Sequence, residues 1–285
     1  MSNSVGRPSS SLRSRDKLPT IGLHNKLQAY QQRIEDGVIS RVNKVDMSTL
    51  TNIYHVSLYC NDIQQHMQAT EKQTQPNGFY MRKQTDINEN VRAILVDWII
   101  SVHAKFKLLP ETLYLTINLI DRYFSQFNVS KAEVQLVGIT ALLISTKYEE
   151  IYPPTVKDFI YLTDNTFTRQ QILTMEKNML FHLQFDIQQT SPYRFLERYS
   201  KIAKADSVIF YLAQYLLELA LLDSKMNQYK PSLLASTAIY VAMRVQLQDQ
   251  SRRNRQQQQS VWTRDLVENT GYQNSDLQNC AKNYF

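Results

Sequence analysis

Apolar residues recur every three or four positions along most of the chain after residue 50, the spacing that places them on one face of an α-helix. Between Tyr54 and Met67 this spacing predicts a short docking helix. A stronger pattern begins near Asn88, where Asp86 and Glu89 have the spacing of a capping box. The apolar face predicted for this helix consists of Val91, Ile94, Leu95, Trp98, Ile99, Val102 and Phe106.

The next two predicted helices are apolar on nearly all sides, which is typical of helices buried by their neighbours. One follows Pro110, and the other opens at a Ser130–Glu133 capping box and continues through Ile144. A short helix is predicted to start near Thr155, with Asp158 three residues on. A fifth is predicted from Thr168 to Phe181, with Gln171 completing its capping box. The resulting unit is a compact five-helix domain.

The rest of the chain repeats this order. Ser191 and Pro192 form an N-cap followed by proline at the first helical position. Helices are predicted at 192–201, 206–222, 231–247, 262–269 and 275–285, with a solvated loop at Gln248–Gln259. We therefore expect an all-α fold with two tandem five-helix domains after a short helix and a disordered N-terminal tail. The predicted boundaries are 1–50, 51–187 and 188–285.

Composition agrees with this plan. The chain has 285 residues, 43% of them hydrophobic, and only 6 Gly and 8 Pro, which favours long helices. Cys60 and Cys280 lie far apart, and no Cys and His residues have metal-ligand spacing. No apolar run reaches the length of a membrane span.

Residues 1–50 carry eight Lys and Arg against four Asp and Glu, so the basic charge favours a solvated tail over a nucleic-acid surface. We expect no nucleic-acid or membrane partner.

No enzyme motif is present, and the five histidines fall in separate segments, so no catalytic residue, metal or cofactor is expected. One local anomaly is the string Lys147-Tyr148-Glu149-Glu150-Ile151. It ends the most apolar helix with two carboxylates, where the helix dipole disfavours negative charge. Such a local conflict marks either a functional site or a solvated helix end.

Several strings resemble mitotic cyclins in order and spacing from about Tyr54 to Phe285. They are V-R-A-I-L-V-D-W at 91–98, H-A-K-F-K-L at 103–108, P-E-T-L-Y-L at 110–115, I-D-R-Y at 120–123, V-Q-L-V-G at 134–138, K-Y-E-E-I at 147–151, T-D-N-T at 163–166 and M-E at 175–176. The string His103–Phe106, and W-T at 262–263, T-G-Y at 270–272 and C-A-K at 280–282, favour the B-type over the A-type.

The resemblance implies a regulatory subunit that forms a heterodimer with a cyclin-dependent protein kinase. The residues at the kinase-binding positions are Lys147, Tyr148, Glu150, Glu176, Phe185 and Ile187. In the family, the matching lysine and glutamate hydrogen-bond the kinase backbone around its C-helix. The alternative for Lys147 and Glu176 is an internal salt bridge with no partner. Arg92 and Asp121 match a buried ion pair of cyclins and are assigned to structure.

The resemblance also implies a hydrophobic patch that docks R-x-L peptides of substrates or inhibitors. The matching residues are Val91, Ile94, Leu95, Trp98, Val134 and Gln135. The alternative is that some of these residues belong to the core, because Ile94 and Leu95 cannot both face solvent fully. Val91 replaces the usual methionine, and Ser101 stands where A-type members carry an acidic residue, so an altered docking preference is expected.

In the tail, Arg15, Leu18 and Ile21 resemble the cyclin destruction box, with Leu23 in place of its final asparagine. This implies degradation through a ubiquitin ligase that acts at mitotic exit. The resemblance further implies a location in the nucleus and cytoplasm. Family members usually continue beyond the position of Phe285, so the second domain is expected to be cut short.

The mechanism implied is allosteric, with the kinase C-helix held in its active position. One alternative is a transcription factor built from the same tandem repeats, which predicts a basic stripe along the folded domains. Another is a helical scaffold with no kinase partner, which leaves the string at 147–151 unexplained.

Overall fold

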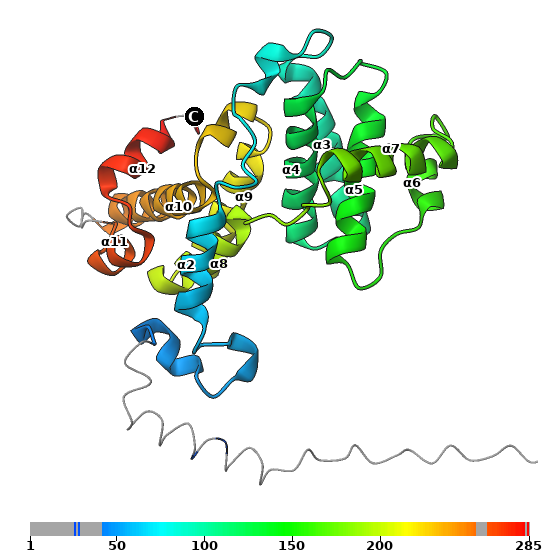
Figure 1. Cartoon of the computed structure of the whole chain (residues 1–285). Coiled ribbons are helices and arrows are strands. Elements are labelled where there is room, and N and C mark those ends of the chain that lie inside the picture. Colours follow the sequence, from blue (N-terminus) through cyan, green and yellow to red (C-terminus); the bar gives the residue numbers. More distant parts are fainter. Residues whose placement is uncertain (1–25, 27, 29–41, 255–260, 283, 285) are drawn as a thin grey trace, which may run out of the picture. The chain divides into compact units, whose positions relative to one another are not determined.

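The computed structural model describes residues 26, 28, 42–254, 261–282 and 284 (Figure 1). The regular secondary structure of these residues consists of α-helices and 3₁₀ helices, without a strand. The chain divides into two compact units, residues 1–63 and 64–285. The predicted all-α fold with two tandem five-helix domains is confirmed.

The first unit contains two short 3₁₀ helices, η2 (Lys44–Thr49) and η3 (Ile53–His55), and the start of helix α2 (Cys60–Thr70). The prediction of one helix from Tyr54 to Met67 was wrong at its beginning. Val56 adopts a left-handed conformation with φ of 43° and ends η3. A β-branched residue rarely takes this conformation, and it breaks the helical path before Cys60.

The second unit opens its first helical domain after the 3₁₀ helix η4 (Tyr80–Lys83). The five helices of this domain are α3 (Glu89–Phe106), α4 (Pro110–Gln126), α5 (Val134–Glu149), α6 (Val156–Leu162) and α7 (Arg169–His182). Helix α5 is buried at every position from Val134 to Thr146 except Gln135, which is partly exposed, and it packs against α3, α4, α6 and α7. Helices α4 and α5 are therefore central, as their apolar sequences predict.

The second helical domain consists of α8 (Pro192–Ala203), α9 (Ser207–Ala220), α10 (Pro231–Asn254), α11 (Arg264–Thr270) and α12 (Asn274–Ala281), with the 3₁₀ helix η5 (Ser224–Gln228) between α9 and α10. Helix α10 packs against α8, α9 and α12. Its buried alanines, Ala235, Ala238 and Ala242, let these helices approach closely.

From Gln64 onward, α2 contacts the second helical domain. Gln64 Nε2 donates to the carbonyl oxygen of Asn269 at 2.5 Å, and Gln68 Nε2 donates to the Tyr199 hydroxyl at 3.2 Å. Just after the helix, the buried carboxylate of Glu71 accepts a bond from the Ser232 amide at 3.0 Å. In Figure 1, α2 accordingly lies beside α8.

A buried ion pair connects the two helical domains. Arg92 on α3 and Asp121 on α4 are each 1% exposed and form two parallel bonds, Nε to Oδ1 and Nη2 to Oδ2, both of 2.7 Å. Arg92 Nη1 also donates to the carbonyl oxygens of Leu221 and Leu222, at 2.8 and 3.1 Å, just after α9. The guanidinium therefore holds the end of α9 against the first domain.

Asp121 completes this network with two further acceptor bonds. The Tyr80 hydroxyl donates to Oδ1 at 2.5 Å, and Asn227 Nδ2 donates to Oδ2 at 2.7 Å. Burial and the Asp121 carboxylate raise the pKa of Tyr80, which keeps the phenol protonated as a donor. We call Arg92, Asp121, Tyr80 and Asn227 the interdomain clamp.

The Ser191 cap forms as predicted, and of the four predicted capping boxes two form as expected and two do not. Thr155 with Asp158 and Thr168 with Gln171 make reciprocal capping boxes. At α3, however, Asn88 is the N-cap and accepts from the Val91 amide, so the box assigned to Asp86 and Glu89 was wrong. Ile87 is buried in the core, and Asn88, the residue after it, is where the helix starts. Glu133 does bond to Ser130, but 131–133 form a turn and α5 begins at Val134.

Helix ends in the second domain also differ from the prediction. Helix α10 continues to Asn254, so the loop predicted at Gln248–Gln259 was wrong over its first seven residues; 255–259 lie outside the described residues. Gln, Arg and Asp are compatible with an exposed helix as well as with a loop, and polarity alone does not separate the two. Helix α11 begins at Arg264, capped by Thr263, and α12 ends at Ala281.

Removing one side of the interdomain clamp leaves a buried charge without its partner. We expect Arg92→Leu or Asp121→Leu to lower the free energy of unfolding by about 3–5 kcal/mol. The double substitution is expected to cost less than the sum of the two, because no lone buried charge remains. Urea denaturation measures these differences.

Lys225→Ala is the matched control for this prediction. Its ammonium also joins the second domain to α3, at 3.2 Å from Glu89, but both side chains are 52% exposed. Such a surface pair contributes at most about 1 kcal/mol. A single substitution in the clamp that costs no more than Lys225→Ala would contradict its structural role.

Candidate functional site

The last turn of α5 leaves the core of the first domain and carries an exposed lysine. Lys147 Nζ lies 2.6 Å from Glu176 Oε1 on α7, and the two side chains are 46% and 13% exposed. The buried length of α5 fixes the position of Lys147 from one side, and Glu176 fixes it from the other. The structure thus brings together the two predicted charged residues in an internal salt bridge that remains accessible.

Large apolar side chains follow both helices that carry this pair. Tyr148, in the last turn of α5, is 52% exposed, and Ile151 and Tyr152, just after the helix, are 85% and 91% exposed. After α7, Phe185 is 69% exposed, whereas Ile187 packs against the core. Together with Lys147 and Glu176, we call Tyr148, Ile151, Tyr152 and Phe185 the α5–α7 edge. Several exposed aromatic residues on one domain are typical of a protein-binding surface.

The backbone at Phe185 is strained. Gln184 and Phe185 have φ of 55° and 57°, in the left-handed region that non-glycine residues rarely adopt. Such a conformation costs on the order of 1 kcal/mol or more per residue and persists only where the surrounding structure imposes it. Here it closes the end of α7, where the Phe185 amide donates to the Leu180 carbonyl oxygen at 2.9 Å, and the Phe185 side chain remains in solvent.

Glu150 makes internal contacts in this structure. Its Oε1 accepts bonds from the Leu109 amide at 2.8 Å and the Thr112 hydroxyl at 2.6 Å, which satisfies donors at the start of α4. This capping role was not expected from the sequence, because Leu109 and Glu150 are 41 positions apart. A kinase-binding role for Glu150 remains a prediction.

The second predicted surface lies on α3 and the start of α5. Ile94 is 70% exposed, Val91, Trp98 and Gln135 are partly buried, and Leu95 and Val134 belong to the core. Ile94 therefore does not share the buried face predicted for α3. Beneath the surface, a Cβ on Gly138 would stand 2.6 Å from Leu95 Cδ1, so glycine permits the close packing of α3 and α5. We call the six predicted residues the α3–α5 patch: Val91, Ile94, Leu95, Trp98, Val134 and Gln135.

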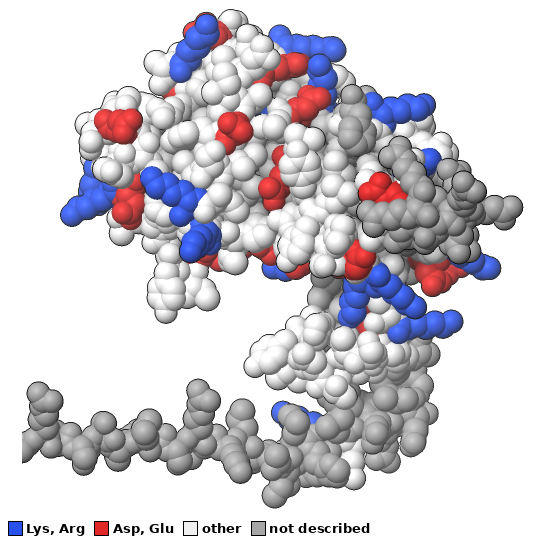
Figure 2. Space-filling view, turned by 180° about the vertical axis from the view of Figure 1, so that it is seen from behind, with Lys and Arg blue, Asp and Glu red and all other residues white. Residues whose placement is uncertain are grey.

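Charges on the face shown in Figure 2 are of both signs. Lys and Arg residues form small groups separated by Asp, Glu and uncharged residues, without a continuous basic stripe among the residues described on this face. The described residues also contain no group of His, Cys, Asp and Glu that could hold a metal ion. None of their helices has the length and apolar character needed to cross a bilayer. Arg15, Leu18 and Ile21 lie outside the described residues.

Comparison with known proteins assigns the family. Residues 62–188 match the family described as "Cyclin, N-terminal domain", and residues 190–284 match "Cyclin, C-terminal domain". The fold is similar to the X-ray structure of a viral cyclin from herpesvirus saimiri, with a TM-score of 0.65 and 19% identity over 78% of this chain and 98% of that one. This chain belongs to the cyclin family, whose members are regulatory subunits and not enzymes.

Among its relatives, B-type mitotic cyclins are prominent. Cyclin-B1-2 of Arabidopsis thaliana is 39% identical over 248 residues, which is 86% of this chain and 53% of the relative. The G2/mitotic-specific cyclin-B of Dictyostelium discoideum is 39% identical, over 80% of this chain and 50% of the relative. The G2/mitotic-specific cyclin-A of Hydra viridissima is also 39% identical, over 82% and 54%. The assignment to mitotic cyclins, with the B-type favoured, is confirmed. The chain spans about half the length of these relatives.

Glu149, next to Glu150, generates a prediction about pH. Partial burial, Glu111 and Glu150 raise the pKa of Glu149 above its ordinary value of 4.5, although Arg194 opposes the shift. The folded protein therefore binds this proton more tightly than the unfolded chain, and ionisation at neutral pH destabilises the fold. We expect Glu149→Gln to be more stable than the wild type at pH 7.

This advantage should be complete above the raised pKa and should disappear as the pH falls to about 4.5 and below, where Glu149 is protonated in both states. The measurement is the difference in free energy of unfolding between variant and wild type from pH 7.5 to 4. Taking the difference removes the contribution of the carboxylates that do not interact with Glu149. An advantage that is constant, or that grows on acidification, would contradict the assignment.

Proposed function

We propose that this protein binds and allosterically activates a cyclin-dependent serine/threonine kinase and helps recruit its substrates at the onset of mitosis. The observation that carries the proposal is the α5–α7 edge. It combines a positioned, accessible ion pair with exposed aromatic side chains on a rigid helical core. Family membership and the similarity to mitotic cyclins agree with this function and weigh against a promoter-binding factor or a scaffold without a kinase.

The edge offers both kinds of contact that a stable interface needs. Tyr148, Tyr152 and Phe185 supply large apolar area, and aromatic residues are enriched among those that dominate binding energy. Lys147 adds hydrogen-bond donors, and Glu176 adds acceptors, for backbone groups of the partner. Because the two charges already contact each other, little side-chain entropy is lost when a partner backbone joins them.

Activation follows from selective binding. A kinase is active when a glutamate of its C-helix pairs with the ATP-binding lysine. A subunit that binds only this arrangement shifts the equilibrium toward it. Moving the ratio from 1:99 to 99:1 requires about 5.5 kcal/mol of differential binding, which a protein interface of ordinary size can supply. The regulatory subunit contributes no catalytic group.

The α3–α5 patch supports the recruitment of R-x-L substrates or inhibitors. Ile94 stands in solvent beside Trp98 and Gln135, so an apolar peptide side chain can dock there without displacing the core. This patch and the α5–α7 edge use different residues, so docking and activation are separable. Ser101 stands where A-type cyclins carry an acidic residue, so the arginine of the R-x-L motif would lack that contact here.

Degradation and location rest on the sequence. In the proposed mechanism, Arg15, Leu18 and Ile21 are recognised by a ubiquitin ligase at mitotic exit, which would end kinase activation. The protein would act in the nucleus and cytoplasm, as mitotic cyclins do.

Kinase affinity tests the role of Lys147 and Glu176. Truncation of one partner in a desolvated polar contact costs about 2–5 kcal/mol, so Lys147→Ala and Glu176→Ala should weaken kinase binding at least about tenfold. Fold stability should change by about 1 kcal/mol or less, because the pair is partly exposed. Titration calorimetry with a purified cyclin-dependent kinase and a histone phosphorylation assay measure the two effects.

Charge reversal separates the two roles of this pair. Lys147→Glu combined with Glu176→Lys can retain the internal ion pair but presents the opposite charges to the kinase. If the pair acts only within the fold, this double variant binds the kinase normally, and the proposed site is wrong. Lys177→Ala, an exposed neighbour of Glu176 on α7, is the matched control and should bind like the wild type.

Substrate kinetics test the α3–α5 patch. Ile94→Ala and Gln135→Ala should raise the KM for an R-x-L substrate severalfold and leave phosphorylation of a short peptide without the motif unchanged. Ile94 is exposed, so its truncation avoids the cavity that Trp98→Ala would create next to the core. Equal losses on both substrates would show that the patch acts through folding or kinase binding.

A further inference from the structure

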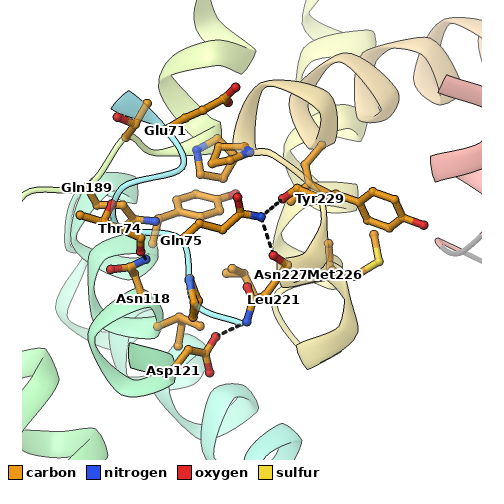
Figure 3. Close-up of a pocket in the computed structure, with 18 of the residues that line it drawn as sticks. Glu71, Thr74, Gln75, Asn118, Asp121, Gln189, Leu221, Met226, Asn227 and Tyr229 are labelled. Atoms are coloured by element: carbon orange, nitrogen blue, oxygen red, sulfur yellow. Dashed lines mark hydrogen bonds between the residues drawn. The ribbon is translucent and has the colours of Figure 1, made fainter. Parts of the chain in front are cut away.

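A cavity of about 60 Å³ lies where the two helical domains meet (Figure 3). Its walls come from α4, from the segment between α2 and η4, and from the end of the segment that leads into α8, including Pro192, the first residue of that helix. The second domain closes it with residues at the end of α9, on η5 and at the start of α10. The cavity is distinct from the α5–α7 edge and the α3–α5 patch, since it shares no residue with either.

Three side chains that line this cavity end in a buried oxygen with no hydrogen-bond partner among the described residues. They are the Tyr114 hydroxyl, Asn118 Oδ1 and Gln189 Oε1. Tyr114 and Asn118 are 2% and 6% exposed. A buried polar atom without a partner costs about 1–3 kcal/mol, so the convergence of three around one cavity calls for a bound group that satisfies them.

Three amide nitrogens of the same wall are already committed, those of Gln75, Asn118 and Asn227. Gln75 Nε2 donates to the carbonyl oxygens of Asn227 and Tyr229, at 2.6 and 2.8 Å, and Asn227 Nδ2 donates to Asp121 (Figure 3). Asn118 Nδ2 donates to the Thr74 carbonyl oxygen at 2.9 Å, which fixes the orientation of its amide and leaves Oδ1 as an acceptor. The cavity therefore offers two amide oxygens as acceptors, those of Asn118 and Gln189, and the Tyr114 hydroxyl, which can donate or accept.

Apolar side chains complete the walls. Ile117, Leu217, Leu221 and Met226 line the cavity together with Ala220. Its volume corresponds to about four to six water molecules, taking roughly 10–15 Å³ for each. A ligand that fits is accordingly small, with an apolar body and a nitrogen that donates. Gln75 and Tyr229 are only partly buried, so the site is reachable from solvent.

We propose that this interdomain cavity is a binding site for a compact, neutral N–H donor, such as a five-membered nitrogen heterocycle. The N–H of the ligand donates to an amide oxygen of Asn118 or Gln189, its second ring nitrogen accepts from the Tyr114 hydroxyl, and its ring packs against the aliphatic wall. Because both domains contribute walls, an occupied site stabilises the junction between them.

Pyrazole and 1-methylpyrazole are the matched probes, since methylation removes the donor and leaves the ring unchanged. The full chain is labelled with ¹³C at its methionine methyl groups, and Met226→Leu assigns the Met226 signal. Pyrazole is expected to shift this signal saturably with a millimolar Kd. The N-methyl compound should bind at least about tenfold more weakly.

Variants place the probe in the cavity. Tyr114→Phe should weaken pyrazole binding about two- to tenfold, the range for one hydrogen bond, without lowering the melting temperature, because an unpartnered hydroxyl is removed. Tyr193→Phe is the control, because Tyr193 stacks near Tyr114 at 6.2 Å but does not line the cavity. Ala220→Val should fill the space and abolish binding.

Any of three results would overturn the proposal. A shift that rises without saturation means non-specific solvation. Equal binding of the two pyrazoles means that the acceptors are not used. Unchanged affinity in both Tyr114→Phe and Ala220→Val means that the probe binds elsewhere, and the spread of methionine signals shows that each variant is folded.

Discussion

The structure of the second unit depends on one desolvated ion pair. Arg92 and Asp121 lie at 1% exposure, where an unpaired charge is untenable, so every remaining donor and acceptor of the pair must find a partner. Tyr80 supplies one of these partners, and the others come from the second domain: the carbonyls of Leu221 and Leu222 and the amide of Asn227. The alignment of the two domains is thus set by hydrogen-bond directions and not by apolar contact alone, which tolerates sliding.

This alignment has consequences for the proposed kinase site. Helix α5 packs against α3 and α4, the two helices that the ion pair joins, and its burial continues to Thr146. Lys147 is the next residue, so its backbone is fixed by the core while its side chain is accessible. A binding group held in this way loses little conformational freedom when a partner arrives. The rigid core and the exposed edge are two results of the same packing.

The sequence predicts well what short-range physics determines. Helical periodicity located all ten helices of the two domains, and Thr155 with Asp158 forms its box because both residues lie within one turn. Predictions failed where two local caps compete, as at Asn88, which caps α3 in place of Asp86, or where polarity fits two structures, as at the end of α10. Arg92 and Asp121 were found by resemblance, but Tyr80, Asn227 and the capping bonds of Glu150 give no local signal. The binding roles of Lys147 and Glu176 remain predictions.

The interdomain cavity persists for the same reason that the domains are aligned. Protein interiors normally close to high packing density, and an empty space is unfavourable. Closing this one would require the walls to move together, yet Arg92 holds the carbonyls of Leu221 and Leu222, and Gln75 holds those of Asn227 and Tyr229. Each such bond would have to break and leave a buried group unpaired, at about 1–3 kcal/mol. The clamp therefore preserves a space that apolar packing alone would remove, and the acceptors around it remain available to a ligand.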